Sequence, residues 1–199
     1  AIIISFLLSL PSMAQRVELP RAKFMTGDKI EYSFPSTNDD AWREISSNTQ
    51  WEFQGVSNYD GYAWYRFHLF VPKQLRTNSL WKDSLRIFLG KVDDVCEVFM
   101  NGTKIGKSGS FPEDKEGYIT TWSKTLEFHL DANSPFFNWG GENILSVRVY
   151  DGGGAGGIFG NVPYVNMIDL VDGVVINNKS SVQFISNTKA RKNISLNNI

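Results

Sequence analysis

The chain has 199 residues, which is enough for one sizeable domain with its own core, or for one domain and a fragment. Hydrophobic residues make up 42% of it and charged residues 21%, as in an ordinary globular protein. The formal net charge is −1, so there is no excess positive charge with which to bind nucleic acid or an anionic membrane surface.

The aromatic content is high, at 14% of all residues. Aromatic residues favour strands, so the composition indicates an all-β fold. They also stack on sugar rings, but core packing is the simpler interpretation for most of them. A single cysteine, Cys96, excludes an intrachain disulfide, and its apolar neighbours are typical of a buried, unreactive thiol.

Residues 1–14 have the pattern of a secretory signal. An apolar run over residues 1–10 is followed by Pro11-Ser12-Met13-Ala14, with small residues at Ser12 and Ala14, and we expect cleavage after Ala14. The run is too short to span a bilayer as a helix. It lacks an initiator Met and a positive n-region, so the start of the signal is expected to be missing. We expect an exported protein, and the lone cysteine favours a bacterial periplasm or cell surface.

Short strands separated by turns are predicted along most of the chain. Asn38-Asp39-Asp40 is typical of an Asx turn or of a short helical turn, with Trp42 as an anchor after it. Asn101-Gly102 supplies the two positive φ angles of a type I′ turn, which predicts a hairpin. No stretch has a sustained helical period, so the pattern indicates a sandwich or barrel. The predicted strands are 24–26, 62–72, 85–89 closed by Gly90, 92–100, 103–106, 122–130, 142–150 and 167–176.

A glycine loop, residues 151–157, separates two of the predicted strands. No Lys-Ser/Thr follows it and no helix opens after it, so it is not a phosphate-binding loop. Beyond Asn177 the composition shifts to Asn, Ser and Lys. We therefore expect a sandwich over residues 15–176, and a linker, a tail or the start of a further domain over residues 177–199.

Five segments together resemble a known family. They resemble the sugar-binding jelly roll of family 2 glycoside hydrolases, a domain type similar to one in bacterial sialate O-acetylesterases, over roughly Phe24 to Leu170. The resemblance implies an all-β jelly-roll β-sandwich of the galactose-binding-domain type, a carbohydrate partner, and a catalytic domain in the same or a neighbouring chain. The segments are Gly61-Tyr62-Ala63-Trp64-Tyr65-Arg66, Val71-Pro72, residues 89–94 (LGKVDD), residues 98–106 (VFMNGTKIG) and residues 141–149 (GENILSVRV).

The central motif residues have mainly structural interpretations. Trp64 and Tyr65 are consecutive, so they should face opposite sides of one strand. Arg66 needs an acidic partner near a core, and Asp93 or Asp94 is expected to supply it. Asp93 and Asp94 are also consecutive, so they should point opposite ways and cannot flank one bond together. A salt bridge, a turn hydrogen bond or a cation contact suits them better than catalysis.

No complete catalytic or metal constellation is recognisable, and we expect no catalytic residue in this chain. A family 2 hydrolase places its two glutamates in a separate barrel, which needs a β/α alternation that is absent here. A Gly-x-Ser-x-Gly elbow is also absent. His68 and His129 lie far apart within predicted strands and do not make a zinc site. A structural calcium ion held by loop oxygens stays open, with Asp151 and Asp39 as conceivable ligands.

Sugar binding, if present, should use aromatic residues in loops together with planar polar groups. Two hypotheses follow. The chain is a non-catalytic carbohydrate-binding module of a glycoside hydrolase, or it is a structural domain that braces a catalytic barrel or serves an exported carbohydrate esterase. Hydrolysis by this chain alone is the weakest alternative. The candidate ligand contacts are Trp51, Tyr59, Asp60, Tyr62, Trp139, Asp151 and Asn161, with Tyr164 and Asn138 as further members of the same set.

Overall fold

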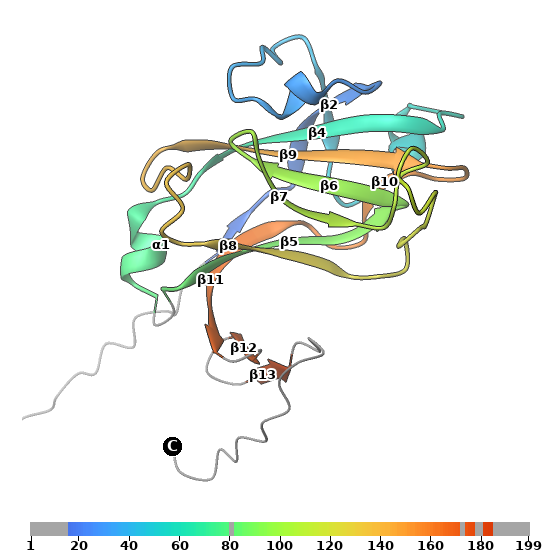
Figure 1. Cartoon of the computed structure of the whole chain (residues 1–199). Coiled ribbons are helices and arrows are strands. Elements are labelled where there is room, and N and C mark those ends of the chain that lie inside the picture. The colour runs from blue at the N-terminus through green and yellow to red at the C-terminus, as the bar shows by residue number, and fades with distance from the viewer. Residues whose placement is uncertain (1–15, 80–81, 172–173, 178–180, 185–199) are drawn as a thin grey trace, which may run out of the picture.

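The computed structural model describes residues 16–79, 82–171, 174–177 and 181–184, and the side chains of residues 169–184 are not described. Two antiparallel sheets pack face to face as a sandwich (Figure 1). The helical segments are short, namely η1 (Ile30–Ser33), η2 (Trp51–Gln54) and α1 (Lys73–Thr77). The expected all-β sandwich is therefore confirmed.

The first sheet has six strands and carries the longest pairing in the molecule. β4 and β9 are antiparallel over ten residue pairs, from Gly61 opposite Asp151 to Phe70 opposite Glu142. In order across the sheet the strands are β3 (Arg43–Ser46), β2 (Arg21–Thr26), β4 (Gly61–Phe70), β9 (Glu142–Asp151), β6 (Val95–Met100) and β7 (Thr103–Ser108).

The second sheet has seven strands, built around β5 (Ser84–Asp93) and β11 (Tyr164–Val171). β12 and β13 continue this sheet beyond β11, so the segment expected to be a linker, tail or new domain contributes a strand paired with β12. The remaining strands are β1 (Arg16–Glu18), β8 (Leu126–Asp131), β10 (Gly157–Phe159), β12 (Val174–Asn177) and β13 (Ser181–Phe184).

The core lies between the sheets and follows the alternation of strand side chains. Tyr65 points inward into the main core, whereas Trp64 points outward. This confirms the expected opposite orientation of the two residues. Trp64 forms a second, smaller core with Trp42 and Phe99, which the loop over residues 27–42 covers. Figure 1 shows this loop above the six-stranded sheet.

Arg66 anchors the same loop, and its predicted partner was wrong. The fully buried guanidinium pairs with Asp39, with 2.7 Å between Nε and Oδ2, instead of with Asp93 or Asp94. It also donates hydrogen bonds to the main-chain carbonyls of residues 32, 34 and 37. The Asx turn at Asn38 is confirmed, because the Asp40 amide donates to its side-chain oxygen. That turn presents Asp39 to the sheet, a placement that strand spacing does not reveal.

Two glycines show where strand prediction succeeded and where it failed. Asn101 and Gly102 have φ angles of 49° and 82°, and the predicted hairpin between β6 and β7 is confirmed. Gly90 was expected to end a strand, but β5 continues through it to Asp93 with an irregularity between Phe88 and Gly90. The φ of 77° at Gly90 accommodates this irregularity without breaking the sheet.

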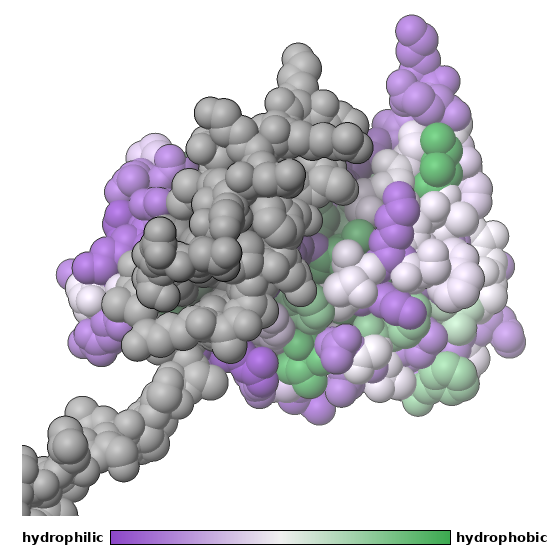
Figure 2. Space-filling view, turned by 90° about the horizontal axis from the view of Figure 1, so that it is seen from below, coloured by the Kyte–Doolittle hydropathy of each residue, from purple (hydrophilic) through white to green (hydrophobic). Residues whose placement is uncertain are grey.

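The expected secretory signal, residues 1–14, lies outside the described residues. Within the described part of the chain, no helix is long and apolar enough to cross a membrane. Figure 2 views the molecule from the side of the seven-stranded sheet, where hydrophilic and hydrophobic residues are mixed over the part not drawn in grey.

Candidate functional site

Five carboxyl groups gather at the end of the sandwich where β4 begins and where β5 and β9 end. This region, called the acidic end below, lies beside β10 at the right of Figure 1. Several of these carboxyl groups repel one another, and this repulsion helps to raise the pKa values of Asp93 and Asp151. The five residues are Glu52, Asp60, Asp93, Asp94 and Asp151.

Asp94 is the acceptor at the centre of the acidic end. Its carboxylate accepts hydrogen bonds from the hydroxyls of Tyr118 and Thr120 and from the Gly152 amide, the last at 3.0 Å. Burial opposes its ionisation, but hydrogen bonds from Asp93, Thr120 and Tyr118 outweigh burial and lower the pKa of Asp94. These are long-range hydrogen bonds to distant loops, instead of the turn hydrogen bond that was one of the roles expected for this residue.

Asp93 and Asp94 interact directly, which corrects the expectation that they point opposite ways. Asp93 ends β5, and Asp94 lies between β5 and β6, outside either strand, so pleat alternation does not apply. Burial, then a hydrogen bond and repulsion from Asp94, raise the pKa of Asp93 to about 8. Asp93 therefore holds a proton at neutral pH and shares it with the ionised Asp94.

Asp151 closes β9 and is completely buried. Burial raises its pKa to about 6, and the nearby carboxylates of Asp94 and Glu52 add to the effect. One of its oxygens accepts a hydrogen bond from the Gly153 amide at 2.9 Å. The other oxygen, Oδ2, is buried and has no hydrogen-bond partner among the described residues.

Glu52, in η2, also has one carboxylate oxygen bonded to an amide of the glycine loop and one that has no partner in the described part of the chain. Its Oε2 accepts a hydrogen bond from the Gly156 amide at 2.9 Å, whereas Oε1 is buried without a partner in the described structure. A buried acceptor without a donor is costly, so a proton, a water molecule or a ligand hydroxyl is needed at both oxygens. The acidic end therefore has unused capacity to accept hydrogen bonds.

The glycine loop packs closely over Asp151 Oδ2, because Gly156 has no side chain. A Cβ atom at Gly156 would lie 2.5 Å from Asp151 Oδ2 and 2.3 Å from the Trp51 ring. At Gly157 it would lie 2.3 Å from the Tyr65 hydroxyl. A ligand hydroxyl can reach Asp151 Oδ2 only when this loop moves. The loop joins β9 to β10, a strand, which fits the expectation that it is not a phosphate-binding loop.

Two exposed aromatic residues that the sequence analysis missed flank Asp94. Tyr118 is 44% exposed and Trp122 is 50% exposed. The Tyr118 hydroxyl donates to Asp94, and the Trp122 amide donates to Thr120, which itself donates to Asp94. Trp122 was assigned to a strand, but β8 begins only at Leu126. The signal that could have found it is the break in alternation at Ser123-Lys124.

The predicted contacts Trp51, Tyr59, Asp60 and Asp151 are brought together at the acidic end. Trp51 was expected in a loop, but it lies in η2 and its ring is fully buried, so it supports the loops around it. The Trp51 indole donates to the Tyr59 carbonyl at 3.2 Å, and the two rings are 5.9 Å apart. Asp60 is exposed.

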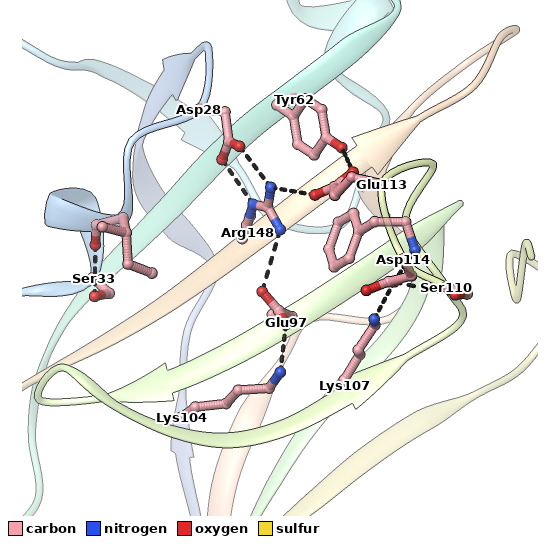
Figure 3. Close-up of polar contacts among 12 residues, drawn as sticks. Asp28, Ser33, Tyr62, Glu97, Lys104, Lys107, Ser110, Glu113, Asp114 and Arg148 are labelled. Carbon is pink, nitrogen blue, oxygen red and sulfur yellow. Dashed lines mark hydrogen bonds and ion pairs between the residues drawn. The ribbon is translucent and has the colours of Figure 1, made fainter. Parts of the chain in front are cut away.

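Tyr62 lies within β4 instead of in a loop and belongs to a charged cluster on the outer face of the sheet (Figure 3). Its hydroxyl donates to Glu113. The Arg148 guanidinium lies 4.6 Å above the Tyr62 ring and is bonded to both oxygens of Asp28, at 2.7 and 2.6 Å. Glu97 and Glu113 also pair with Arg148. This cluster fastens two loops to the sheet.

The remaining candidates lie elsewhere. Trp139 is at the α1 end, where its indole donates to the Ala132 carbonyl at 2.9 Å and Arg76 of α1 stacks on its ring. Asn161 is exposed just after β10. Tyr164 was expected in a loop but begins β11. The structure therefore does not unite the predicted contacts into one site.

Metal binding is not supported by the geometry. Within the described ranges, no group of three or more His, Cys, Asp or Glu side chains is arranged to hold a metal ion. Asp39, a conceivable calcium ligand, is committed to Arg66 and His68 instead. Cys96 is buried, and burial raises the pKa of its thiol to about 12, which confirms the expected unreactive thiol.

The fold defined above is that of a β-sandwich found in family 2 glycoside hydrolases. A Bacteroides uniformis beta-glucuronidase matches with a TM-score of 0.57 and 18% identity, over 77% of this chain and 18% of its own. A family 2 member from Bacteroides cellulosilyticus DSM 14838 matches with a TM-score of 0.56 and 19% identity, over 77% of this chain and 20% of its own. A Ruminococcus gnavus b-glucuronidase in complex with D-glucuronic acid matches with a TM-score of 0.56 and 12% identity. The match covers 80% of this chain and 32% of that enzyme.

This likeness confirms the predicted resemblance at the level of the fold. The chain spans between about a fifth and a third of the length of these enzymes. No protein-family model matches the sequence, and no curated protein is similar to it.

Proposed function

We propose that this chain is a non-catalytic, carbohydrate-binding sandwich that serves a glycoside hydrolase, whose reaction is carried out by a catalytic domain in the same or a neighbouring chain. The fold supports this proposal, because solved family 2 enzymes contain the same sandwich as a minor part of their length. The expected secretory pattern of residues 1–14 supports export to a bacterial periplasm or cell surface. The sandwich itself is proposed to occupy residues 15–176.

The observation that carries the proposal is the unused hydrogen-bonding capacity of the acidic end beside exposed aromatic rings. Asp151 Oδ2 and Glu52 Oε1 need donors, and sugar hydroxyls are donors. Tyr118, whose hydroxyl donates to Asp94, is partly exposed and offers an apolar face for the C–H face of a sugar ring, and the exposed Trp122 lies on the same segment. In this proposal the glycine loop moves aside when the sugar binds.

The same geometry argues against hydrolysis at the acidic end. A glycosidase needs two carboxyl groups about 5–10 Å apart, so that the scissile bond fits between them. Asp93 and Asp94 have pKa values displaced in opposite directions, as an acid and base pair does, but they are hydrogen-bonded to each other. No glycosidic oxygen fits between groups in direct contact.

A glycan array probed with the purified full chain tests the proposal. We expect binding to neutral oligosaccharides, and at least a roughly 10-fold loss in the Asp151→Asn variant, which keeps the shape but not the charge. Asp83→Asn is the matched control, because Asp83 is exposed beside the first residue of β5, at the opposite end of that strand. Silence of the wild-type chain on all glycans contradicts the proposal.

A structural role is the second candidate, and the burial of both unpaired oxygens favours it. In this case Asp93 keeps its proton, the glycine loop stays closed, and the acidic end only holds loops together. Hydrogen exchange of the amides of Gly153 and Gly156 separates the two candidates. Protection that stays unchanged when a glycan is added supports the structural role.

A further inference from the structure

A second region with the features of a binding site lies on the outer face of the six-stranded sheet, away from the acidic end. Two hollows of about 270 and 360 Å³ share one lining residue, His68, and together they are called the His68 groove. The first hollow is lined by Arg21, Ala22, Lys23, Asp39, Asp40, Glu44, Arg66 and His68. The second is lined by Pro35, His68, Asn101, Phe136, Asn138, Glu142 and Ile144.

The fold holds the imidazole of His68 at the junction of the two hollows. His68 points outward from β4, and its Nε2 lies 2.9 Å from Oδ2 of Asp39, in the covering loop. Its Nδ1 lies 3.2 Å from Oε1 of Glu142, the first residue of β9. The side chain is still 42% exposed. The ring is therefore oriented by two carboxylates while one side of it faces solvent.

Charges in the first hollow are balanced. Three cationic residues (Arg21, Lys23 and Arg66) face three acidic residues (Asp39, Asp40 and Glu44). Arg21 pairs with Glu44, and Arg66 pairs with Asp39. A hollow with equal numbers of both signs attracts neither anions nor cations strongly, so its chemistry favours a neutral ligand with many hydroxyl groups.

The second hollow combines an apolar wall with a polar edge. Pro35, Phe136 and Ile144 provide the apolar wall. Glu142 has a side chain that is 70% exposed and uses one oxygen for His68, so its second oxygen faces solvent. The Asn138 amide nitrogen donates to the Glu142 carbonyl, which leaves its side-chain oxygen as an acceptor for a ligand. A ligand with a C–H face and a hydroxyl edge matches this division.

We propose that the His68 groove binds a neutral oligosaccharide, with one sugar unit in each hollow and the His68 ring between them. The ligand class rests on the proposed carbohydrate function, whereas the position of the site does not. Each hollow is close to the lower limit of small-molecule pockets, about 300 Å³, so each accommodates one small unit. Binding here is independent of any movement of the glycine loop.

Chemical-shift mapping of the isotopically labelled full chain tests this site. The probes are cello-, xylo-, manno- and galacto-oligosaccharides of two to six units, added to about 10 mM so that weak binding is detected. We expect the amide and imidazole signals of His68, Asn138 and Glu142 to shift with saturable dependence on at least one probe. These shifts should persist unchanged in Asp151→Asn, because that residue belongs to the acidic end.

Variants of Glu142 separate binding from folding. Glu142→Ala should weaken binding to the groove by about 10-fold. Glu142→Gln should also weaken it, but by less than about 10-fold. Glu142→Gln keeps the side-chain shape, so it covers the case in which the alanine variant folds poorly. Glu18→Ala is the control, because Glu18 is an exposed acid on β1 of the other sheet, and it should bind as the wild type does.

Two results overturn the proposal, and they differ in what they say of the acidic end. Shifts confined to the acidic end and lost in Asp151→Asn overturn the His68 groove but support the proposed function. Absence of saturable shifts with every probe overturns the groove and counts equally against the proposed function.

Discussion

Buried charges in this sandwich are stabilised in two different ways. Arg66 and Asp39 neutralise each other, and carbonyl groups of the covering loop accept the remaining guanidinium hydrogens. At the acidic end, burial and the neighbouring carboxylates raise the pKa of Asp93 to about 8 and that of Asp151 to about 6, so Asp93 keeps its proton at neutral pH and Asp151 takes one up in mild acid. The two regions should therefore respond differently to substitution and to pH.

Arg66→Leu should be strongly destabilising, because it leaves the buried Asp39 without its buried cationic partner and with only the half-exposed His68 beside it. Breaking a buried pair in this way costs about 3–5 kcal/mol. The double variant Arg66→Leu/Asp39→Leu should recover part of that loss, since no lone charge remains. Urea denaturation measures each free energy of unfolding. Equal stability of the single variant and the wild type would contradict the account of the covering loop.

Arg21→Ala is the matched control for this prediction. It removes an arginine that pairs with Glu44 on the same side of the sheet, but more than half of each side chain is exposed. Exposed pairs contribute about 0–1 kcal/mol, so this variant should unfold almost as the wild type does.

Asp93 predicts how stability depends on pH. Its pKa rises from the ordinary 3.8 to about 8 on folding, so the folded chain binds more protons than the unfolded chain between these values. The contribution of Asp93 to stability is therefore highest below about pH 4 and is lost as the pH rises through about 8. Solvent screening limits the loss to the order of 1–3 kcal/mol.

The Asp93→Asn variant checks this sign. It removes the titrating group, so the decline in melting temperature between about pH 5 and about pH 9 should be smaller than in the wild type. Asp83→Asn, at an exposed residue beside the opposite end of β5, should keep the wild-type profile. A steeper decline in Asp93→Asn would contradict the assignment of a proton to Asp93.

At the scale of elements, local chemistry explains which strands were predictable. The hairpin at Asn101-Gly102 was predictable because a type I′ turn needs two positive φ angles at adjacent residues. The continuation of β5 through Gly90 was not, because glycine suits both a strand end and an irregular position inside a strand. Trp122 was misplaced because the alternation of residues 126–130 was extended back across Ser123 and Lys124, where it is broken.

The glycine loop allows a comparison of strain with packing. Gly154 and Gly157 have similar φ angles, 102° and 105°. A Cβ at Gly157 meets the Tyr65 hydroxyl at 2.3 Å, whereas a Cβ at Gly154 meets nothing within 4 Å. An alanine at either position must adopt a positive φ angle, so the cost of backbone strain is the same in both variants. Only Gly157→Ala also overpacks its surroundings, so it should be less stable than Gly154→Ala by about 1–3 kcal/mol. Thermal denaturation of the pair measures this difference, and equal stability would contradict close packing of the loop.

At the scale of the whole molecule, the sequence predicted the architecture better than the site. Composition, turn residues and alternation all favour one fold class, and each is a local property. The acidic end depends on distant segments instead, since Glu52, Asp93 and Asp151 meet only when the two sheets are assembled. For the same reason Arg66 was given the wrong partner. Its true partner, Asp39, lies 27 residues away, on a loop that crosses the outer face of the sheet.

The fold likeness covers only a minor part of each solved family 2 enzyme. In the solved family 2 enzymes the matched region is a fifth to a third of the chain. That share is the same for both roles proposed above, glycan binding and the bracing of a neighbouring domain, so the likeness does not choose between them. Of these roles, carbohydrate binding is the one that can be measured directly on the isolated chain.

Calorimetric titration of the purified chain with the oligosaccharide that gives the strongest array response is therefore the most direct measurement. We expect saturable heat with a Kd between about 1 μM and 1 mM, and at least a roughly 10-fold weaker Kd in Asp151→Asn. Absence of saturable heat, or the same Kd in both proteins, would contradict a glycan site at the acidic end.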